Sequence, residues 1–191
     1  MDTLDPRATA LVLIDLQRGI LPFAGGPHSA AQVLTAAAAL ARRFRALGAP
    51  VALVRMGFSE GYPELLRQPT DQPPPVPPGG LPAGWSDLPD ELMVSPRDIP
   101  ITKRHWNAFH GTELDLQLRR RGVVSIVLGG IATGFGVEST ARAGWELGYA
   151  QILAEDAMSA PTAEHHRFSV ENILPRLGRV RPTAEILTAL A

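Results

Sequence analysis

Short apolar runs alternate with amphipathic helices along most of the chain, and this alternation constrains the fold more than any other feature. The first run, Ala10 to Ile14 (ALVLI), is continuously apolar and ends at Asp15, which is the pattern of a strand buried on both faces. From Val33 to Leu47 apolar residues recur at helical spacing, until a glycine and a proline end the helix. A second strand is then predicted at Val51 to Val54.

The same alternation continues through the second half of the chain. The expected elements there are strands at 99–102, 123–128, 151–154 and near Val180, and helices at 113–121, 137–147, 163–177 (broken near Pro175) and from about Thr183. Strands that alternate with such helices form right-handed β-α-β crossovers. We therefore predict one domain over residues 1–191, with a three-layer α/β/α architecture, a central parallel sheet of five or six strands and Rossmann-like topology.

A proline-rich segment interrupts this pattern between Tyr62 and Pro100. It includes PPPVPPGG at Pro73 to Gly80 and shows little periodicity, so we interpret residues 62–98 as a surface excursion from the domain. A proline-rich ligand for another protein is the alternative. Trp85 is a candidate to close over a site or to cover a neighbouring subunit.

The charge balance and the absence of cysteine exclude several classes of function. With 18 basic and 19 acidic residues, the chain has no field that would attract nucleic acid or an anionic membrane. Residues 1–7 resemble neither a signal peptide nor a membrane anchor, so we expect a cytoplasmic protein. The lack of cysteine excludes disulfides and thiol catalysis. We predict no cofactor and no metal, because the histidines lack the spacing of a ligand set: His28, His105, His110, His165 and His166.

Lys103 is the only lysine among the 18 basic residues of the chain. A sequence so biased toward arginine would be expected to use arginine wherever a positive charge alone is needed, yet the two side chains differ in pKa and shape. We therefore interpret Lys103 as a position that requires an amine, with a surface lysine of no function as the alternative.

Three features follow predicted strands and should meet at one edge of the sheet. Asp15 follows the first strand, Lys103 follows the strand at 99–102, and Gly129 to Gly136 (GGIATGFG) follows the strand at 123–128. Ligands of parallel α/β sheets bind at the carboxyl ends of the strands. A carboxylate, an amine and a glycine turn with free backbone N–H groups would together form a small-molecule site. The alternatives are a helix N-cap for Asp15 and a packing role for the glycines.

The glycine turn matches neither common nucleotide-binding loop. Phe135 occupies the position of the Walker lysine, and Ser139 replaces the third glycine of the dinucleotide fingerprint. Nucleotide binding is therefore disfavoured.

Three segments of the chain resemble signature segments of one known superfamily. They are LVLIDLQRGI (11–20), KRHWNAFHGTELD (103–115) and GIATGFGVESTARAGWELGY (130–149), in the order found in the isochorismatase-like cysteine hydrolases. The zinc-binding Asp-x-His pattern of the nicotinamidase branch is absent after the second strand. The resemblance implies a homodimer or homotetramer that buries part of the proline-rich segment.

The resemblance also implies roles for individual residues. The family's catalytic aspartate, lysine and cysteine correspond to Asp15, Lys103 and Gly136, and a backbone oxyanion site with a cis peptide is implied before Ala132 or Thr133. The residues implied by position to line or border the substrate pocket are Gln17, Phe23, Phe58, Trp106, Ala132, Thr133 and Phe135.

Glycine at the nucleophile position decides which chemistry the chain can perform. Amide hydrolysis through a thiolate is excluded. True isochorismatases resemble this chain in having glycine there, and they cleave a vinyl ether with the aspartate as the acid. We therefore predict a hydrolase without a nucleophile that acts on a small carboxylated metabolite, with Asp15 as general acid.

The match to the isochorismatases is incomplete, so the substrate stays open. Ala132-Thr133-Gly134 replaces a Tyr-Ala-His stretch, and the residues from Lys103 to Trp106 replace Lys-Trp-Arg-Tyr. A non-catalytic ligand-binding or scaffold relative, and a chain whose nucleophile was deliberately replaced, are the alternatives to an active enzyme.

Overall fold

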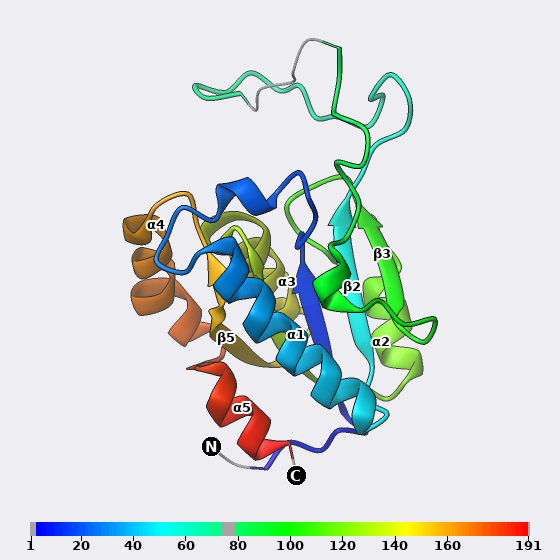
Figure 1. The fold of residues 1–191 in the computed structure, drawn as a ribbon, viewed down its shortest axis with the longest axis vertical. Coiled ribbons are helices and arrows are strands. Elements are labelled where there is room, and N and C mark those ends of the chain that lie inside the picture. Colours follow the sequence, from blue (N-terminus) through cyan, green and yellow to red (C-terminus); the bar gives the residue numbers. More distant parts are fainter. Residues whose placement is uncertain (1–2, 74–78, 191) are drawn as a thin grey trace.

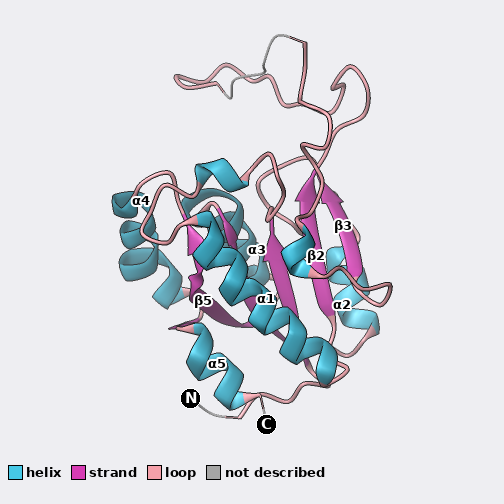
Figure 2. Cartoon of the chain, in the orientation of Figure 1, coloured by secondary structure: helices cyan, strands magenta, loops and turns pink. Residues whose placement is uncertain are grey.

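A six-stranded parallel sheet forms the centre of the molecule, with helices on both faces (Figures 1 and 2). The computed structural model describes residues 3–73 and 79–190. In sheet order the strands are β3 (Ile99–Lys103), β2 (Val51–Met56), β1 (Thr9–Ile14), β4 (Ser125–Ile131), β5 (Ala150–Ser159) and β6 (Arg179–Arg181). The order reverses between β1 and β4, which is the place where open α/β sheets bind ligands. The predicted fold class is therefore confirmed.

The helices form two layers that cover opposite faces of the sheet (Figure 1). The α-helices are α1 (Ala30–Ala46), α2 (Leu114–Arg120), α3 (Glu138–Glu146), α4 (Ala163–Phe168) and α5 (Thr183–Ala189). Helices α1 and α5 pack on one face, and α2 and α3 pack on the other. Short helical turns are η1 (Leu21–Phe23), η2 (Asp90–Leu92), η3 (Thr133–Val137), η4 (Ser169–Ile173) and η5 (Leu174–Arg176).

Strand β1 joins the two layers because its side chains alternate between them. Leu11 and Leu13 belong to the core beneath α1, whereas Val12 and Ile14 belong to the core beneath α2 and α3. All six residues of β1 are buried, and each large aliphatic side chain contributes about 1.5–3 kcal/mol through removal from water. The continuous apolar run that predicted a central strand therefore fixes the position of Asp15, the next residue.

The glycine-rich segment differs from the predicted strand-to-helix turn. Gly129 and Gly130 belong to β4, which continues to Ile131, so the turn begins at Ala132. Gly130 has φ +133°, and a Cβ atom there would lie 2.1 Å from the backbone oxygen of Ile14. Its glycine allows β4 to approach β1 directly beside Asp15. The sequence pattern indicated that these glycines form a turn. In the structure, glycine is needed at position 130 because β4 packs closely against β1 there.

One further predicted boundary is wrong. Strand β5 continues past Ala154 to Ser159. The side chains of its polar residues, Glu155, Asp156 and Ser159, all have hydrogen-bond partners at the sheet edge. The helix expected at 163–177 with a break near Pro175 is present as α4, η4 and η5, and Pro175 lies in the last of these turns, as predicted.

The proline-rich excursion projects from the carboxyl edge of the sheet as an extended arm (Figure 1). It rejoins the domain through η2, where Leu92 is buried beneath α1, and through an ion pair of 2.7 Å between Arg45 and Asp98. Trp85 packs on Gly19, whose N–H donates to the Trp85 carbonyl at 2.9 Å. Part of the predicted PPPVPPGG segment, residues 74–78, lies outside the described residues. Within residues 3–73 and 79–190, no helix is long and apolar enough to cross a membrane.

Candidate active site

Asp15 and Lys103 form a buried ion pair at the carboxyl edge of the sheet. Asp15 follows β1, Lys103 ends β3, and the Lys103 Nζ atom lies 2.7 Å from Asp15 Oδ2. Lys103 is fully buried and Asp15 is 4% exposed. Nζ also donates to the carbonyl oxygens of His105 at 2.9 Å and Trp106 at 3.0 Å. These contacts use all three donors of the ammonium group, so Lys103 is bound entirely by the protein.

The environment of Asp15 favours its protonated form. Burial raises its pKa to about 6, although the charge and hydrogen bond of Lys103 act in the opposite direction. Asp15 also has φ +52°, and its N–H donates to the Val54 carbonyl at 2.8 Å. Its Oδ1 atom has no hydrogen-bond partner among the described residues. Asp15 is therefore a carboxyl group with one unpaired oxygen and a pKa suited to proton transfer near neutral pH.

Gly136 lies beside this ion pair. A Cβ atom there would be 3.2 Å from Asp15 Oδ2 and 3.7 Å from Lys103 Nζ. The hydroxyl of Thr140 donates to the Gly136 carbonyl at 2.6 Å and accepts from the N–H of Ala108 at 3.0 Å, which ties this turn to the segment after Lys103. The structure thus brings Asp15, Lys103 and Gly136 together, and their catalytic roles remain predictions.

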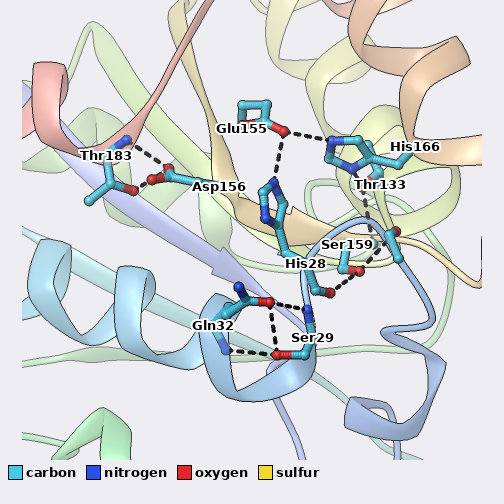
Figure 3. A network of polar contacts seen from close by, with 10 residues as sticks. His28, Ser29, Gln32, Thr133, Glu155, Asp156, Ser159, His166 and Thr183 are labelled. Carbon is cyan, nitrogen blue, oxygen red and sulfur yellow. Dashed lines mark hydrogen bonds and ion pairs between the residues drawn. The ribbon is translucent and has the colours of Figure 1, made fainter. Parts of the chain in front are cut away.

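The turn before Gly136 has the backbone feature that the resemblance implied. The peptide bond between Ile131 and Ala132 is cis. The side chain of Thr133, however, does not face the ion pair: its Oγ1 donates to the Ser159 carbonyl at 3.0 Å and lies 2.9 Å from His166 Nδ1 (Figure 3). The side chain of Thr133 therefore supports the turn from behind, and a direct substrate contact is open only to its backbone.

Gln17 also has a different role from the one its position implied. Its side chain is fully buried, accepts from the Met56 N–H at 2.7 Å, and donates to the carbonyls of Met56 at 3.0 Å and Trp85 at 3.3 Å. These contacts occupy the amide group with backbone partners. Gln17 therefore connects the end of β2 to the proline-rich excursion.

A cavity of about 450 Å³ adjoins the site and is lined by Phe58, Leu65, Arg104, His105 and Trp106 among others. Neither Asp15 nor Lys103 belongs to its lining, but the residues whose carbonyls bind Lys103 do. The Nη1 atom of Arg104 and Nδ1 of His105 are buried and without hydrogen-bond partners in the described part of the chain. Two residues of the cavity wall thus carry buried polar atoms that have no partner within the described part of the chain.

The other two aromatic residues of the predicted pocket lie at the surface. Phe135 is 44% exposed and contacts Trp106 edge-on, with ring centroids 5.1 Å apart. Phe23, in η1, is 52% exposed and does not belong to the cavity lining. Of the aromatic candidates, Phe58 and Trp106 are therefore the two that line the cavity.

A polar cluster that the sequence did not reveal lies behind the turn (Figure 3). Glu155 Oε1 is 2.9 Å from His28 Nε2 and 3.1 Å from His166 Nε2. Burial lowers the pKa of His166, although Glu155 acts in the opposite direction. The expectation of no metal used ligand spacing along the chain, and spacing did not reveal that these residues meet in space.

The fold and the position of the buried acid define a doubly wound α/β protein whose candidate site lies at the carboxyl edge of its sheet. Residues 9–185 match the isochorismatase domain, so the chain belongs to the isochorismatase family, whose members are hydrolases.

Relatives of nearly the same length support this assignment. An uncharacterized isochorismatase family protein of Escherichia coli O157:H7, YecD, is 56% identical over 98% of both chains, and the Bacillus subtilis protein YwoC is 45% identical over 98% of this chain and 97% of its own. A ureidoacrylate amidohydrolase of Azorhizobium caulinodans, RutB, is 32% identical over 96% of this chain and 90% of its own. The structure of an isochorismatase family protein from Burkholderia thailandensis superposes with a TM-score of 0.93 at 43% identity, over 100% of this chain and 98% of that one.

Proposed function

We propose that this isochorismatase-family hydrolase works without a nucleophile and cleaves a vinyl ether, or a similar C–O bond, of a small carboxylated metabolite. The observation that carries the proposal is Asp15: its pKa is raised to about 6 by burial, and one of its oxygens has no partner among the described residues. The adjacent position 136, where the family's cysteine would be, is glycine. The site therefore offers an acid and no covalent catalyst.

The reaction can be written with Asp15 as the only acid. Protonated Asp15 transfers its proton to one alkene carbon of the vinyl ether. The π electrons form the new C–H bond, and the other alkene carbon becomes a cation that the ether oxygen stabilises. Water adds to that cation and gives a hemiketal. The C–O bond to the alcohol then breaks as the hydroxyl proton of the hemiketal is transferred to the leaving oxygen, and the products are a carbonyl compound and an alcohol. The proton lost by water returns to Asp15. Lys103 stabilises the carboxylate form of Asp15 between these two proton transfers.

The substrate's negative charge requires a partner other than Lys103. Lys103 has all three donors occupied by Asp15 and two carbonyls, which argues against binding of a substrate carboxylate. Arg104 lines the cavity and is ion-paired through Nε with Glu64 Oε1 at 3.4 Å, whereas its Nη1 donor is unpaired among the described residues. We therefore assign carboxylate binding to Arg104, whose guanidinium is suited to that group.

A panel of substrates tests this function. Isochorismate and other enol ethers, each compared with an analogue lacking the carboxylate, are followed by product absorbance, with nicotinamide and other amides as controls. We expect turnover of carboxylated enol ethers and none of the amides, because position 136 has no nucleophile. Turnover of an amide would contradict the mechanism. Binding of carboxylated ligands without any turnover would favour the non-catalytic relative.

Restoring a cysteine would test whether the turn is still arranged as a nucleophile position. We expect the thiol of Gly136→Cys to react with iodoacetamide faster than free cysteine at neutral pH, because the Lys103 ammonium, 3.7 Å from the new Cβ, and the start of a helical segment favour the thiolate. The carboxylate of Asp15 acts in the opposite direction but is paired with Lys103. The chain contains no other cysteine, so alkylation reports this position alone.

Gly134→Cys is the matched control, because position 134 is exposed in the same turn. Its thiol shares the start of the helical segment but not the contact with Lys103, so it should react more slowly than the thiol of Gly136→Cys. Equal rates for the two variants, with circular dichroism unchanged, would show that the turn no longer favours a thiolate at position 136.

The proposal includes a homodimer or homotetramer and a cytoplasmic location. The resemblance to the family supports the oligomer, and so does the excursion, which extends away from the domain (Figure 1). It also carries exposed apolar side chains that a second copy could cover. Among these, Leu66 is 51% exposed, and Met93 at its return to the domain is 71% exposed.

A further inference from the structure

Two histidines and a glutamate form a compact cluster beside Thr133 (Figure 3). His28 precedes α1, Glu155 is in β5 and His166 is in α4. The Nε2 atoms of both histidines face the same oxygen of Glu155, at 2.9 and 3.1 Å, and the three potential ligand atoms all lie within 4.8 Å of one another. Residues from three separate elements thus converge on one point.

The hydrogen bonds of Thr133 determine which nitrogen of His166 carries a proton. The Thr133 hydroxyl has a single proton, and the Ser159 carbonyl, 3.0 Å away, can only accept it. The contact of 2.9 Å between Thr133 Oγ1 and His166 Nδ1 then requires Nδ1–H to be the donor. In the neutral ring this leaves Nε2 with a lone pair, directed at Glu155 Oε1 3.1 Å away. Two acceptors therefore face each other, and a cation between them would satisfy both.

We propose that His28 Nε2, His166 Nε2 and Glu155 Oε1 bind a divalent transition-metal ion, with Zn²⁺ the best match. Two imidazoles and one carboxylate are a known ligand set for zinc sites that keep a fourth position open. With Zn–N and Zn–O lengths of about 2.0–2.2 Å, tetrahedral ligand atoms lie roughly 3.3–3.5 Å apart. The observed 2.9 and 3.1 Å would lengthen slightly, and the two Nε2 atoms, which lie within 4.8 Å of each other, would move to a similar separation. The side chains of His28 and Glu155, which are 24% and 31% exposed, have room for this movement.

The surroundings of the cluster match those of a metal site. His166 is 3% exposed, and the hydroxyl of Thr133 fixes its ring by accepting from Nδ1, as the partners of metal-bound histidines do. His28 borders an open groove of about 570 Å³, which gives the fourth position access to solvent. Asp156 also lines this groove, but its Oδ1 accepts from the N–H and hydroxyl of Thr183, so it is not assigned as a ligand.

The proposed ion would act on the candidate active site by positioning. Thr133 begins the η3 turn that contains Gly136, and its side chain is bound between His166 and Ser159. A metal that fixes His166 would therefore fix Thr133 and the backbone of the turn. Asp15 is not among the proposed ligands, so the ion is assigned no role in the proton transfers.

Metal titration of the stripped protein tests the site. Protein treated with a chelator is titrated with Co²⁺, and the visible absorption of tetrahedral Co²⁺ is recorded before displacement by Zn²⁺. We expect saturation at one equivalent per chain, and a higher melting temperature with Zn²⁺. His166→Gln should abolish the absorption band. Because His166 is buried and this variant could misfold, His28→Gln, at a more exposed position, is measured beside it.

The control is His110→Gln. His110 contacts His105, with ring centroids 5.2 Å apart, so this pair resembles the cluster in bringing two histidines together but has no part in it. The control variant should bind Co²⁺ like the wild type. The proposal is overturned if the wild type shows no saturable band, if a folded His28→Gln protein keeps it, or if His110→Gln loses it.

Discussion

Asp15→Asn is expected to lower kcat for the vinyl ether by roughly 10²–10⁴-fold, which is the usual contribution of general acid catalysis. The amide has nearly the shape of the carboxyl group and can still accept from Lys103 Nζ, but it cannot transfer a proton to carbon. In the wild type, kcat should fall as the pH rises through about 6, because Asp15 then loses its proton. The variant should lack this pH dependence. Steady-state rates across the pH range measure both effects.

Asp98→Asn is a matched control for this experiment. Asp98 is also a buried carboxylate in an ion pair, 2.7 Å from Arg45, but it lies where the excursion rejoins the domain and not at the candidate site. Its replacement should leave kcat and the pH profile unchanged once folding has been verified by circular dichroism. Undiminished cleavage by Asp15→Asn, or an equal loss in both variants, would exclude Asp15 as the acid.

The sequence was sufficient to predict the ion pair because both partners are marked by local features. Asp15 directly follows a run of five apolar residues, and Lys103 is the single lysine of the chain at the end of another strand. In a parallel sheet the carboxyl ends of the strands share one edge, so two strand ends imply proximity. The structure places these side chains 2.7 Å apart across the intervening β2.

Side-chain direction could not be predicted in the same way. Thr133 and Gln17 are adjacent to the site in sequence, but both side chains bond to other partners: Thr133 to Ser159 and His166, and Gln17 to Met56 and Trp85. Position along a strand or turn gives the neighbourhood of a residue. Which way its side chain points depends on backbone torsions and on partners distant in sequence.

The His28 cluster shows a second limit of sequence reasoning. Its ligands are separated by 127 residues between His28 and Glu155 and by 11 between Glu155 and His166. No local spacing connects them, because they come from the segment before α1, from β5 and from α4. The extension of β5 past Ala154, which the sequence pattern did not predict, places Glu155 in the strand beside the two histidines.

Lys103→Met is expected to destabilise the protein by about 3–5 kcal/mol, the usual cost of removing one partner from a buried ion pair. Methionine has a similar length and no charge, so the Asp15 carboxylate would lose its counter-charge. The carbonyls of His105 and Trp106 would also lose their donor. Urea denaturation at pH values below and above about 6 measures the change in the free energy of unfolding.

The sign of the pH dependence follows from the raised pKa of Asp15. In the unfolded chain this group ionises near its model value of 3.8, whereas in the folded wild type it ionises near about 6. Removing Lys103 raises the folded pKa further, because burial is then unopposed. The folded variant therefore binds more protons than the unfolded one over a wider range, and its stability falls as the pH rises. The deficit relative to the wild type should be larger above pH 6 than below it.

The double variant Asp15→Asn/Lys103→Met separates the ion pair from general effects of packing. With both charges removed, no buried group lacks a counter-charge, so the double variant should be more stable than Lys103→Met above pH 6. The decreases in the free energy of unfolding measured for the two single variants should therefore not be additive. We expect a coupling energy of about 0.5–3 kcal/mol. If the losses add, or if the Lys103→Met deficit is the same on both sides of pH 6, then Lys103 does not stabilise the Asp15 carboxylate. Its occurrence as the only lysine would then need a reason other than the charge of Asp15.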